Sequence, residues 1–183
     1  MSALRDAWGR WRHDGRRRRA LAALASLAQP RRILVVCHGN ACRSPYAAAV
    51  LARALHHRGV VVASAGLVPG SAPEVVHAEA ARRGVRLGAH RPRLVTHADV
   101  VAADLIVVMD ERQREALRDW FGAWWRRVVL LGDFDPDAAS DRAIADPVAG
   151  SAAEVSDCYS RIDRCVATLA GTFGPTFVRA TPA

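Results

Sequence analysis

Four short apolar runs recur along the chain, and the longer stretches between them mix apolar with polar residues. The runs are continuous and rich in β-branched residues, at positions 33–36, 60–64, 105–109 and 128–131. Continuous apolar runs of this length are typical of strands that are buried on both faces of a sheet. They predict strands of a parallel sheet.

The segments between these runs have the end signals of helices. Strands that alternate with helical crossovers form a parallel α/β sheet, so we predict a single α/β domain. Ser44-Pro45 and Gly59 mark the start and end of a first helix, and Pro73 and Gly84 those of a second. Asp110 with Gln113 marks the start of a third helix. Ser151 and Glu154 form a capping box for a last helix over about 152–171.

The charge of the chain is concentrated in an N-terminal arm. All 26 basic residues are arginine, and residues 1–32 hold nine of them against two acidic residues, a net charge of +7. The remaining 17 arginines face 16 acidic residues, a net charge of +1. A basic surface over the whole domain, as nucleic-acid binding would favour, is therefore not indicated, and no nucleic acid is required as a partner.

Three interpretations of the arm, residues 1–30, remain open. Four arginines at 16–19 precede the alanine-rich stretch 20–28, which predicts a short helix that Pro30 ends. In the first interpretation the arm is a solvated, partly disordered extension. In the second it is a basic segment that contacts a membrane surface or an acidic partner. The third interpretation is a signal peptide that ends near Ser26-x-Ala28. No segment is long enough to span a bilayer.

The cysteines do not form the pattern of a secreted disulfide scaffold. There are four in 183 residues, at 37, 42, 158 and 165. This number and scatter favour a reducing, cytoplasmic compartment. Cys158 and Cys165 fall at helical spacing with Val155, Ile162 and Leu169, which predicts a buried stripe on the last helix.

The stretch between the first strand and the first helix has the features of a phosphate cradle. In open parallel sheets, ligands bind beyond the carboxyl ends of the strands. Gly39 and Asn40 tolerate the conformations that turn several N–H groups toward one anion at a helix N-terminus. Arg43 adds a planar cation for two phosphate oxygens. The other common phosphate motifs, G-x-x-x-x-G-K-[ST] and G-x-G-x-x-G, are absent.

Cys37 lies in the floor of this predicted cradle. The helix dipole and Arg43 favour a thiolate there, and a thiolate held against a bound phosphate ester is a nucleophile aimed at phosphorus. Ser44 is placed to donate a hydrogen bond to the sulfur when it becomes the leaving group. An ordinary buried cysteine at a strand end is the simpler interpretation, and the surrounding residues disfavour it.

The segment "VCHGNACRSP" resembles the signature of the low-molecular-weight protein tyrosine phosphatases. The resemblance extends to "VASAGLVPG", "GVRLGAHRPRLVTHADVVAADLIVVMDE", "LLGDFDP" and "IADPVAGSAAEV". It implies a phosphatase domain over 31–172 with a four-stranded parallel sheet flanked by helices. Residues 1–30 are then an extension and 173–183 a C-terminal tail. No metal or cofactor is expected, and the expected partner is a phosphorylated protein substrate.

The resemblance also assigns roles to individual residues. Cys37 is the nucleophile, Arg43 binds the phosphoryl group, and Asp146 is the general acid and then the base. Asp135-Pro136 also fits the family pattern but is more simply a turn, and Asp110 is more simply a helix cap. Loop and support residues are His38, Gly39, Asn40, Ala41, Cys42 and Ser44, with Ser64 and His90 in the polar network behind them. Cys42 is either a space-filling residue or a disulfide partner that protects Cys37 from oxidation.

Two departures from the family pattern affect the substrate. Val148 and Ala149 stand where the family usually has aromatic residues after the catalytic Asp-Pro, and Ala41 is smaller than the usual branched residue. A stacking wall would then have to come from Tyr46 or from the rings at 120–121 or 124–125. Phosphotyrosine in proteins is the first expected substrate, and phosphoarginine is the alternative.

Two other functions remain as alternatives. An arsenate reductase of the same fold would need a relay cysteine just after the third strand, where the chain has Met109. A non-catalytic phosphate-binding module would have no need of Asp146. Both are disfavoured on these residues.

Overall fold

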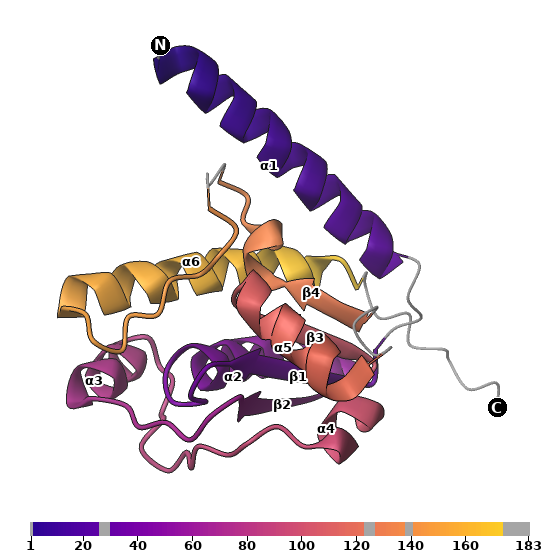
Figure 1. The fold of residues 1–183 in the computed structure, drawn as a ribbon. Helices are drawn as coiled ribbons and strands as arrows, with labels where there is room; N and C mark the ends of the chain where they lie inside the picture. The colour runs from indigo at the N-terminus through magenta and orange to yellow at the C-terminus, as the bar shows by residue number, and fades with distance from the viewer. Residues whose placement is uncertain (1, 26–29, 123–126, 138–140, 174–183) are drawn as a thin grey trace, which may run out of the picture.

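The fold is known from a computed structural model that describes residues 2–25, 30–122, 127–137 and 141–173. Its centre is a parallel four-stranded sheet in the order β2-β1-β3-β4 (Figure 1). The strands are β1 (Arg32–Cys37), β2 (Val61–Gly66), β3 (Leu105–Val108) and β4 (Val128–Leu130). The predicted α/β class and the parallel sheet are confirmed.

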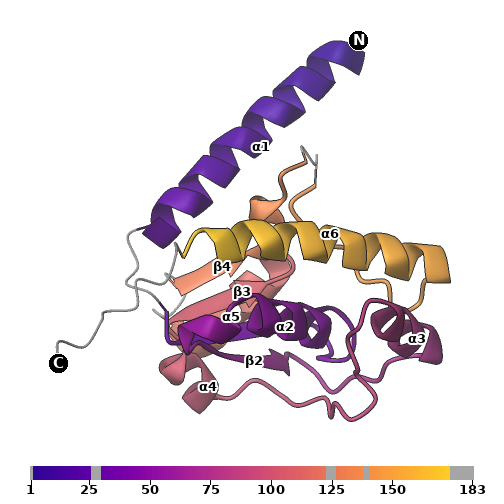
Figure 2. The same cartoon turned by 180° about the vertical axis from the view of Figure 1, so that it is seen from behind.

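Helices cover both faces of this sheet (Figures 1 and 2). On one side α2 (Arg43–Ala54), α3 (Glu74–Arg82) and α6 (Ala152–Gly171) pack in one apolar cluster with Ile33, Val35 and Cys37 of β1. On the other, α4 (His97–Ala102) and α5 (Glu111–Phe121) pack in a second cluster with Leu34 and Val36. Successive side chains of a strand point to opposite faces, so burial of both faces explains the uninterrupted apolar runs.

The end signals read from the sequence are found at helix ends. Asp110 caps α5 by accepting a hydrogen bond from Gln113 N at 2.9 Å, and Ser151 and Glu154 form a capping box on α6. Gly59, after the short helix η1 (His56–Arg58), has φ 65°. The six-residue α4 was not predicted, because it is too short for a helical pattern; a capping box of Thr96 and Asp99 begins it.

The stripe predicted on the last helix is buried. Its five members, Val155, Cys158, Ile162, Cys165 and Leu169, all belong to the core cluster shared with α2. Cys158 and Cys165 are free thiols, and burial raises the pKa of each to about 12. Both therefore stay protonated at neutral pH and serve as apolar core residues.

The N-terminal arm forms a long helix, α1 (Ser2–Ala25). The predicted short helix over 20–28 is wrong in extent: the helix begins at Ser2, and residues 26–29 lie outside the described part of the chain. Leu24 of α1 is buried against the core, and His13 is buried with its Nε2 3.0 Å from Asp135 O. The helix crosses over the β4 end of the sheet, near η3 (Leu131–Phe134) (Figures 1 and 2).

Among the described residues, no helix is long and apolar enough to cross a membrane.

Candidate active site

The predicted cradle lies at the carboxyl edge of the sheet, between the last residue of β1 and the first of α2. Cys37 ends the strand and Arg43 begins the helix. Asn40 has φ 50°, the left-handed conformation that the sequence suggested, and among the described residues it is the one non-glycine with a positive φ. The loop therefore turns sharply just before α2, as an anion cradle at a helix N-terminus requires.

A chain of short hydrogen bonds ties the sulfur to the loop. Cys37 Sγ lies 2.9 Å from Ser44 Oγ. The Asn40 amide donates to Ser44 Oγ at 3.0 Å and to Ser64 Oγ at 2.9 Å, which links the loop to the neighbouring strand β2. Since Asn40 and Ser44 are fully buried, their geometry is fixed by these partners rather than by water.

The two oxygens of Asn40 also have partners. Its backbone oxygen lies 2.8 Å from His90 Nε2, and its Oδ1 accepts a hydrogen bond from Arg93 N at 3.0 Å. The structure thus brings together Ser64 and His90, which the family resemblance assigned to loop support. Arg93 was not predicted, because a backbone donor leaves no residue-type signal in the sequence.

Two glycines that the sequence reasoning missed permit a second loop to pack on the cradle. A Cβ on Gly66 would lie 2.7 Å from Asn40 N, and one on Gly70 would lie 2.7 Å from Gly39 Cα. Leu67 N and Val68 N both donate to His38 O, at 2.8 and 3.0 Å. The signal for this contact was available in "AGLVPG", where glycines bracket a short apolar loop.

Arg43 is buried and faces two carboxylates. Its Nη2 is paired with Asp146 Oδ2, its Nη1 donates to Ile144 O at 2.9 Å, and Nη1 lies 3.7 Å from Asp110 Oδ2. Its Nε is buried and has no hydrogen-bond partner. A guanidinium with a free donor beside a helix N-terminus is suited to an incoming anion.

Arg161 of α6 holds the segment that leads to Asp146. This guanidinium donates to Ala143 O and Asp141 O, both at 2.6 Å, and to Asp135 Oδ2 at 2.9 Å. Asp135 is 1 % exposed, so the first Asp-Pro pair is a buried anchor as well as a turn. Asp146 itself has a 35 % exposed side chain, which leaves it free to meet a substrate.

A cavity of about 140 Å³ brings Cys37 and Asp146 together with part of the predicted loop. None of its described lining residues has a phenol or indole ring. Tyr46 cannot supply one, because it is buried, stacks on Tyr159 at 3.7 Å and donates to Asp163 at 2.9 Å. Trp120 is exposed on α5, and positions 124–125 lie outside the described residues. The lining is Cys37, His38, Gly39, Ala41, Cys42, Val68, Pro69, Gly70, Ser71, Asp146 and Val148.

Cys42 differs from Cys37 in its surroundings. Its Sγ donates to Tyr159 OH at 3.6 Å, and burial raises its pKa to about 12. Cys42 is therefore a protonated thiol that packs toward the core, and both cysteines are free in this structure. A protective disulfide between them stays a prediction. In the described part of the chain, no cluster of three His, Cys, Asp or Glu side chains is arranged to hold a metal ion.

The sequence comparisons agree with this geometry. Residues 32–176 match the family model described as low molecular weight phosphotyrosine protein phosphatase, so the chain belongs to that family. The low molecular weight protein-tyrosine-phosphatase Wzb of Salmonella typhi is 35% identical over 136 residues, which are 73% of this chain and 87% of that protein.

Two solved structures show the same fold. Wzb of Escherichia coli K30 in complex with sulphate superposes with a TM-score of 0.71 at 28% identity, over 79% of this chain and 99% of that one. The YwlE arginine phosphatase from Geobacillus stearothermophilus gives a TM-score of 0.68 at 27% identity, over 78% of this chain and 92% of that one. Phosphatases named for two different phosphorylated residues thus share this fold.

Proposed function

We propose that the protein hydrolyses phosphotyrosine in a phosphorylated protein substrate through a phosphocysteine on Cys37. One observation supports this above the others: Cys37 and Asp146, from two separate loops, line the same cavity, and Arg43 pairs with Asp146. Pure phosphate binding requires neither a nucleophile nor an acid at this position.

Binding begins with an exchange of anions at Arg43. The phosphoryl group enters the cradle of N–H groups from residues 38–43 and takes the free Nε of Arg43. It also competes with Asp146 for Nη2 of Arg43. Asp146, displaced from the guanidinium, takes up a proton from solvent and turns toward the ester oxygen.

Two displacements complete the reaction. Cys37 Sγ attacks phosphorus and forms the S–P bond, while the P–O bond to tyrosine breaks and Asp146 gives its proton to the departing oxygen. Asp146 next removes a proton from a water that attacks phosphorus, and the S–P bond breaks. Ser44 Oγ, 2.9 Å from the sulfur, donates to the thiolate that leaves.

Phosphoarginine is the second candidate substrate, because of the cavity wall. Val148, Val68 and Pro69 provide apolar surface, but none of the three has an aromatic ring on which a phosphotyrosine would stack. The small side chain of Ala41 widens the floor beside them. The likeness to an arginine phosphatase supports the same alternative.

The test is hydrolysis of para-nitrophenyl phosphate between pH 5 and 8. Activity should vanish in Cys37→Ser and fall sharply in Asp146→Asn, whereas Asp137→Asn, an exposed acid on the preceding segment, serves as the matched control. Paired phosphotyrosine and phosphoarginine peptides then decide the substrate. A wild type that binds phosphate or vanadate without turnover would instead indicate a binding module.

The substrate is expected in the cytoplasm, and α1 offers a contact to an anionic surface. Trp11 is 66% exposed beside exposed arginines, a combination that favours membrane interfaces and acidic partners. Retention on anionic vesicles or on an acidic protein, measured against salt concentration with and without residues 1–30, tests this contact. Retention that survives the deletion would exclude the arm as the tether.

A further inference from the structure

A cleft separates α1 from the body of the domain on the side of β4. This cavity has a volume of about 350 Å³, near the lower end of the range for small-molecule pockets, roughly 300–1,000 Å³. It shares no lining residue with the catalytic cavity. Four of its lining side chains are arginines from three parts of the chain: Arg16 and Arg19 of α1, Arg114 of α5, and Arg142.

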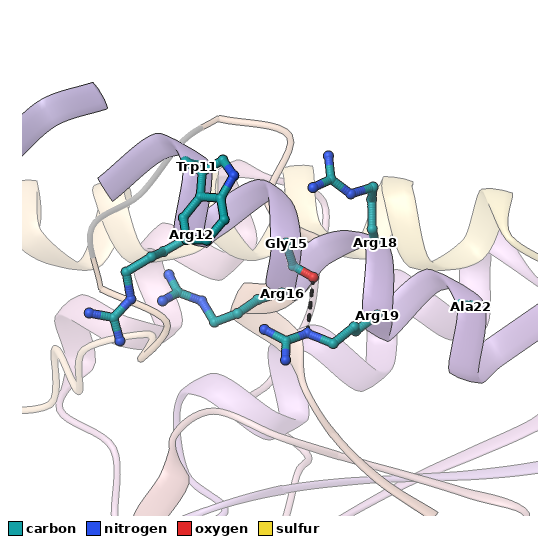
Figure 3. Close-up of a pocket in the computed structure, with 7 residues that line it drawn as sticks. All are labelled: Trp11, Arg12, Gly15, Arg16, Arg18, Arg19 and Ala22. Atoms are coloured by element: carbon teal, nitrogen blue, oxygen red, sulfur yellow. Dashed lines mark hydrogen bonds between the residues drawn. The ribbon is translucent and has the colours of Figure 1, made fainter. Parts of the chain in front are cut away.

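The cleft continues into a larger hollow along α1. That hollow of about 700 Å³ shares Arg16 and Arg19 with the cleft (Figure 3). Gly15 leaves open space there, because nothing lies within 4 Å of where its Cβ would be. Figure 3 also shows the contact from Arg19 Nε to Gly15 O, at 3.2 Å. An anion can therefore enter from the α1 side.

The acidic residues near the cleft do not neutralise these arginines. Asp133 is the one carboxylate in the described lining, and both of its oxygens accept hydrogen bonds from Arg142, at 2.8 and 2.5 Å. Arg16 Nε lies 4.0 Å from Asp133 Oδ1, beyond hydrogen-bond length. Glu111, outside the lining, pairs with Arg114 and accepts from Arg142 at 3.4 Å. The cleft keeps a net positive charge.

Arg16 is the side chain that most requires a ligand. Its Nε and Nη2 are shielded from solvent and have no hydrogen-bond partner. Leaving a charged donor in this state is unfavourable. Burial, and then the nearby positive charge of Arg142, lower the pKa of Arg16. A bound anion would satisfy the donors and offset the repulsion.

We propose that this cleft is a second, non-catalytic site that binds a phosphate group, as inorganic phosphate or as a small soluble phosphomonoester. Guanidinium forks match pairs of phosphate oxygens, and Arg16, Arg19, Arg114 and Arg142 all line this one cleft. A membrane headgroup fits less well, because the cleft is lined by half-buried residues between α1 and the sheet edge. Bound phosphate would hold α1 on the domain.

The test is equilibrium dialysis of the full chain against radiolabelled orthophosphate at constant ionic strength. Arg43→Ala removes the catalytic phosphate site, and this variant should still bind one equivalent. Adding Arg16→Gln and Arg19→Gln should weaken that binding at least tenfold. The control adds Arg86→Gln and Arg112→Gln to Arg43→Ala, at two exposed arginines elsewhere. It removes the same charge and should leave phosphate binding unchanged.

A second measurement tests the site without the arginine-to-glutamine variants, in case these variants do not fold. In Arg43→Ala, phosphate should slow amide hydrogen exchange over residues 11–22, whereas chloride at equal ionic strength should not. No phosphate bound to Arg43→Ala, or equal loss in both double substitutions, overturns the proposal. So does binding of α1 to phosphatidic-acid vesicles without orthophosphate binding. None of these results depends on turnover, so they stand apart from the proposed phosphatase activity.

Discussion

The cradle and the acid loop, residues 141–150, are two halves of one site that are held in different ways. The cradle is a contiguous stretch whose polar groups bond mainly to one another and to adjacent β2, through Asn40. The acid loop is held by distant arginines, Arg161 on α6 and Arg43 on α2. The first arrangement fixes atoms for binding, whereas the second leaves Asp146 exposed enough to change partners during the reaction.

Arg43 is the one residue that serves both halves, so its replacement should have the largest effect. In Arg43→Lys, the ammonium cannot reproduce the fork that contacts Asp146 and Ile144 O. We expect kcat/KM for para-nitrophenyl phosphate to fall about 10³-fold, as for loss of a transition-state donor. Arg53→Lys, on the exposed side of the same helix, is the control. A loss below tenfold would mean that Arg43 does not bind the phosphoryl group.

Replacement of Asn40 tests the rigidity of the cradle alone. Asn40→Ala removes the amide that joins Ser44 to Ser64 and places alanine at φ 50°. We expect unfolding free energy to fall by about 2–3 kcal/mol, from unsatisfied groups and backbone strain, and kcat/KM to fall about 10²-fold. The measurements are chemical denaturation and steady-state kinetics.

Asn40→Gly separates the two causes. Glycine accepts the left-handed conformation without strain, so stability should partly return while activity stays low. Full activity in Asn40→Gly would show that the amide network has no role in positioning the loop.

The two halves also differ in how far the sequence predicts them. The cradle could be predicted because strand, glycine, asparagine, arginine and helix start follow one another within 33–45, and local rules apply. Asp146 entered only through the family resemblance, since Asp-Pro by itself indicates a turn. Arg161 could not be found, because one of 26 arginines carries no mark of its partner. Arg93 could not be found either, because its backbone N–H makes the contact and leaves no signal in the residue type.

The same limit applies to the fold. Continuous apolar runs predicted all four strands. The central strands β1 and β3 are buried on both faces, which leaves a strong local signal, whereas the edge strand β2 is largely half-buried. Docking of α1 through His13 and Leu24 was missed, since it depends on single residues meeting η3 and the core far away in the chain. Tyr46 was wrongly offered as a ring for the substrate because its stacking on Tyr159 is equally non-local.

Replacement of Arg161 tests the acid loop alone. In Arg161→Gln the segment 141–143 loses two short hydrogen bonds, and kcat should fall about tenfold with KM little changed, because Asp146 is misplaced. The loss should be greater for phenyl phosphate, whose leaving group needs a proton, than for para-nitrophenyl phosphate. Arg164→Gln, which contacts Asp135 and Asp137 but not the loop backbone, is the control. Equal losses for both substrates would contradict a positioning role.

The smallest effect is expected outside both halves, where α3 meets α6. Hydrogen bonds from Arg83, opposed by burial and aided by Arg82, lower the pKa of Glu79 to about 2 from 4.5. Because the folded pKa is lower, the stabilisation is complete above about pH 4.5 and is lost as pH falls toward 2. The Tm of wild type should exceed that of Glu79→Gln at pH 6, and the difference should shrink below pH 4.5. Activity at pH 6 should not change; a pH-independent Tm difference would contradict the assignment.

The most direct test of the account is to trap the phosphoenzyme. Asp146→Asn with para-nitrophenyl phosphate should form the intermediate, because this leaving group needs no proton, and should hydrolyse it slowly for lack of a base. Acid quench followed by intact and peptide mass spectrometry should find one phosphoryl group on Cys37, and none when Cys37→Ala is added to Asp146→Asn. A phosphoryl group on Cys42, or turnover that Cys37→Ser leaves intact, would contradict the account.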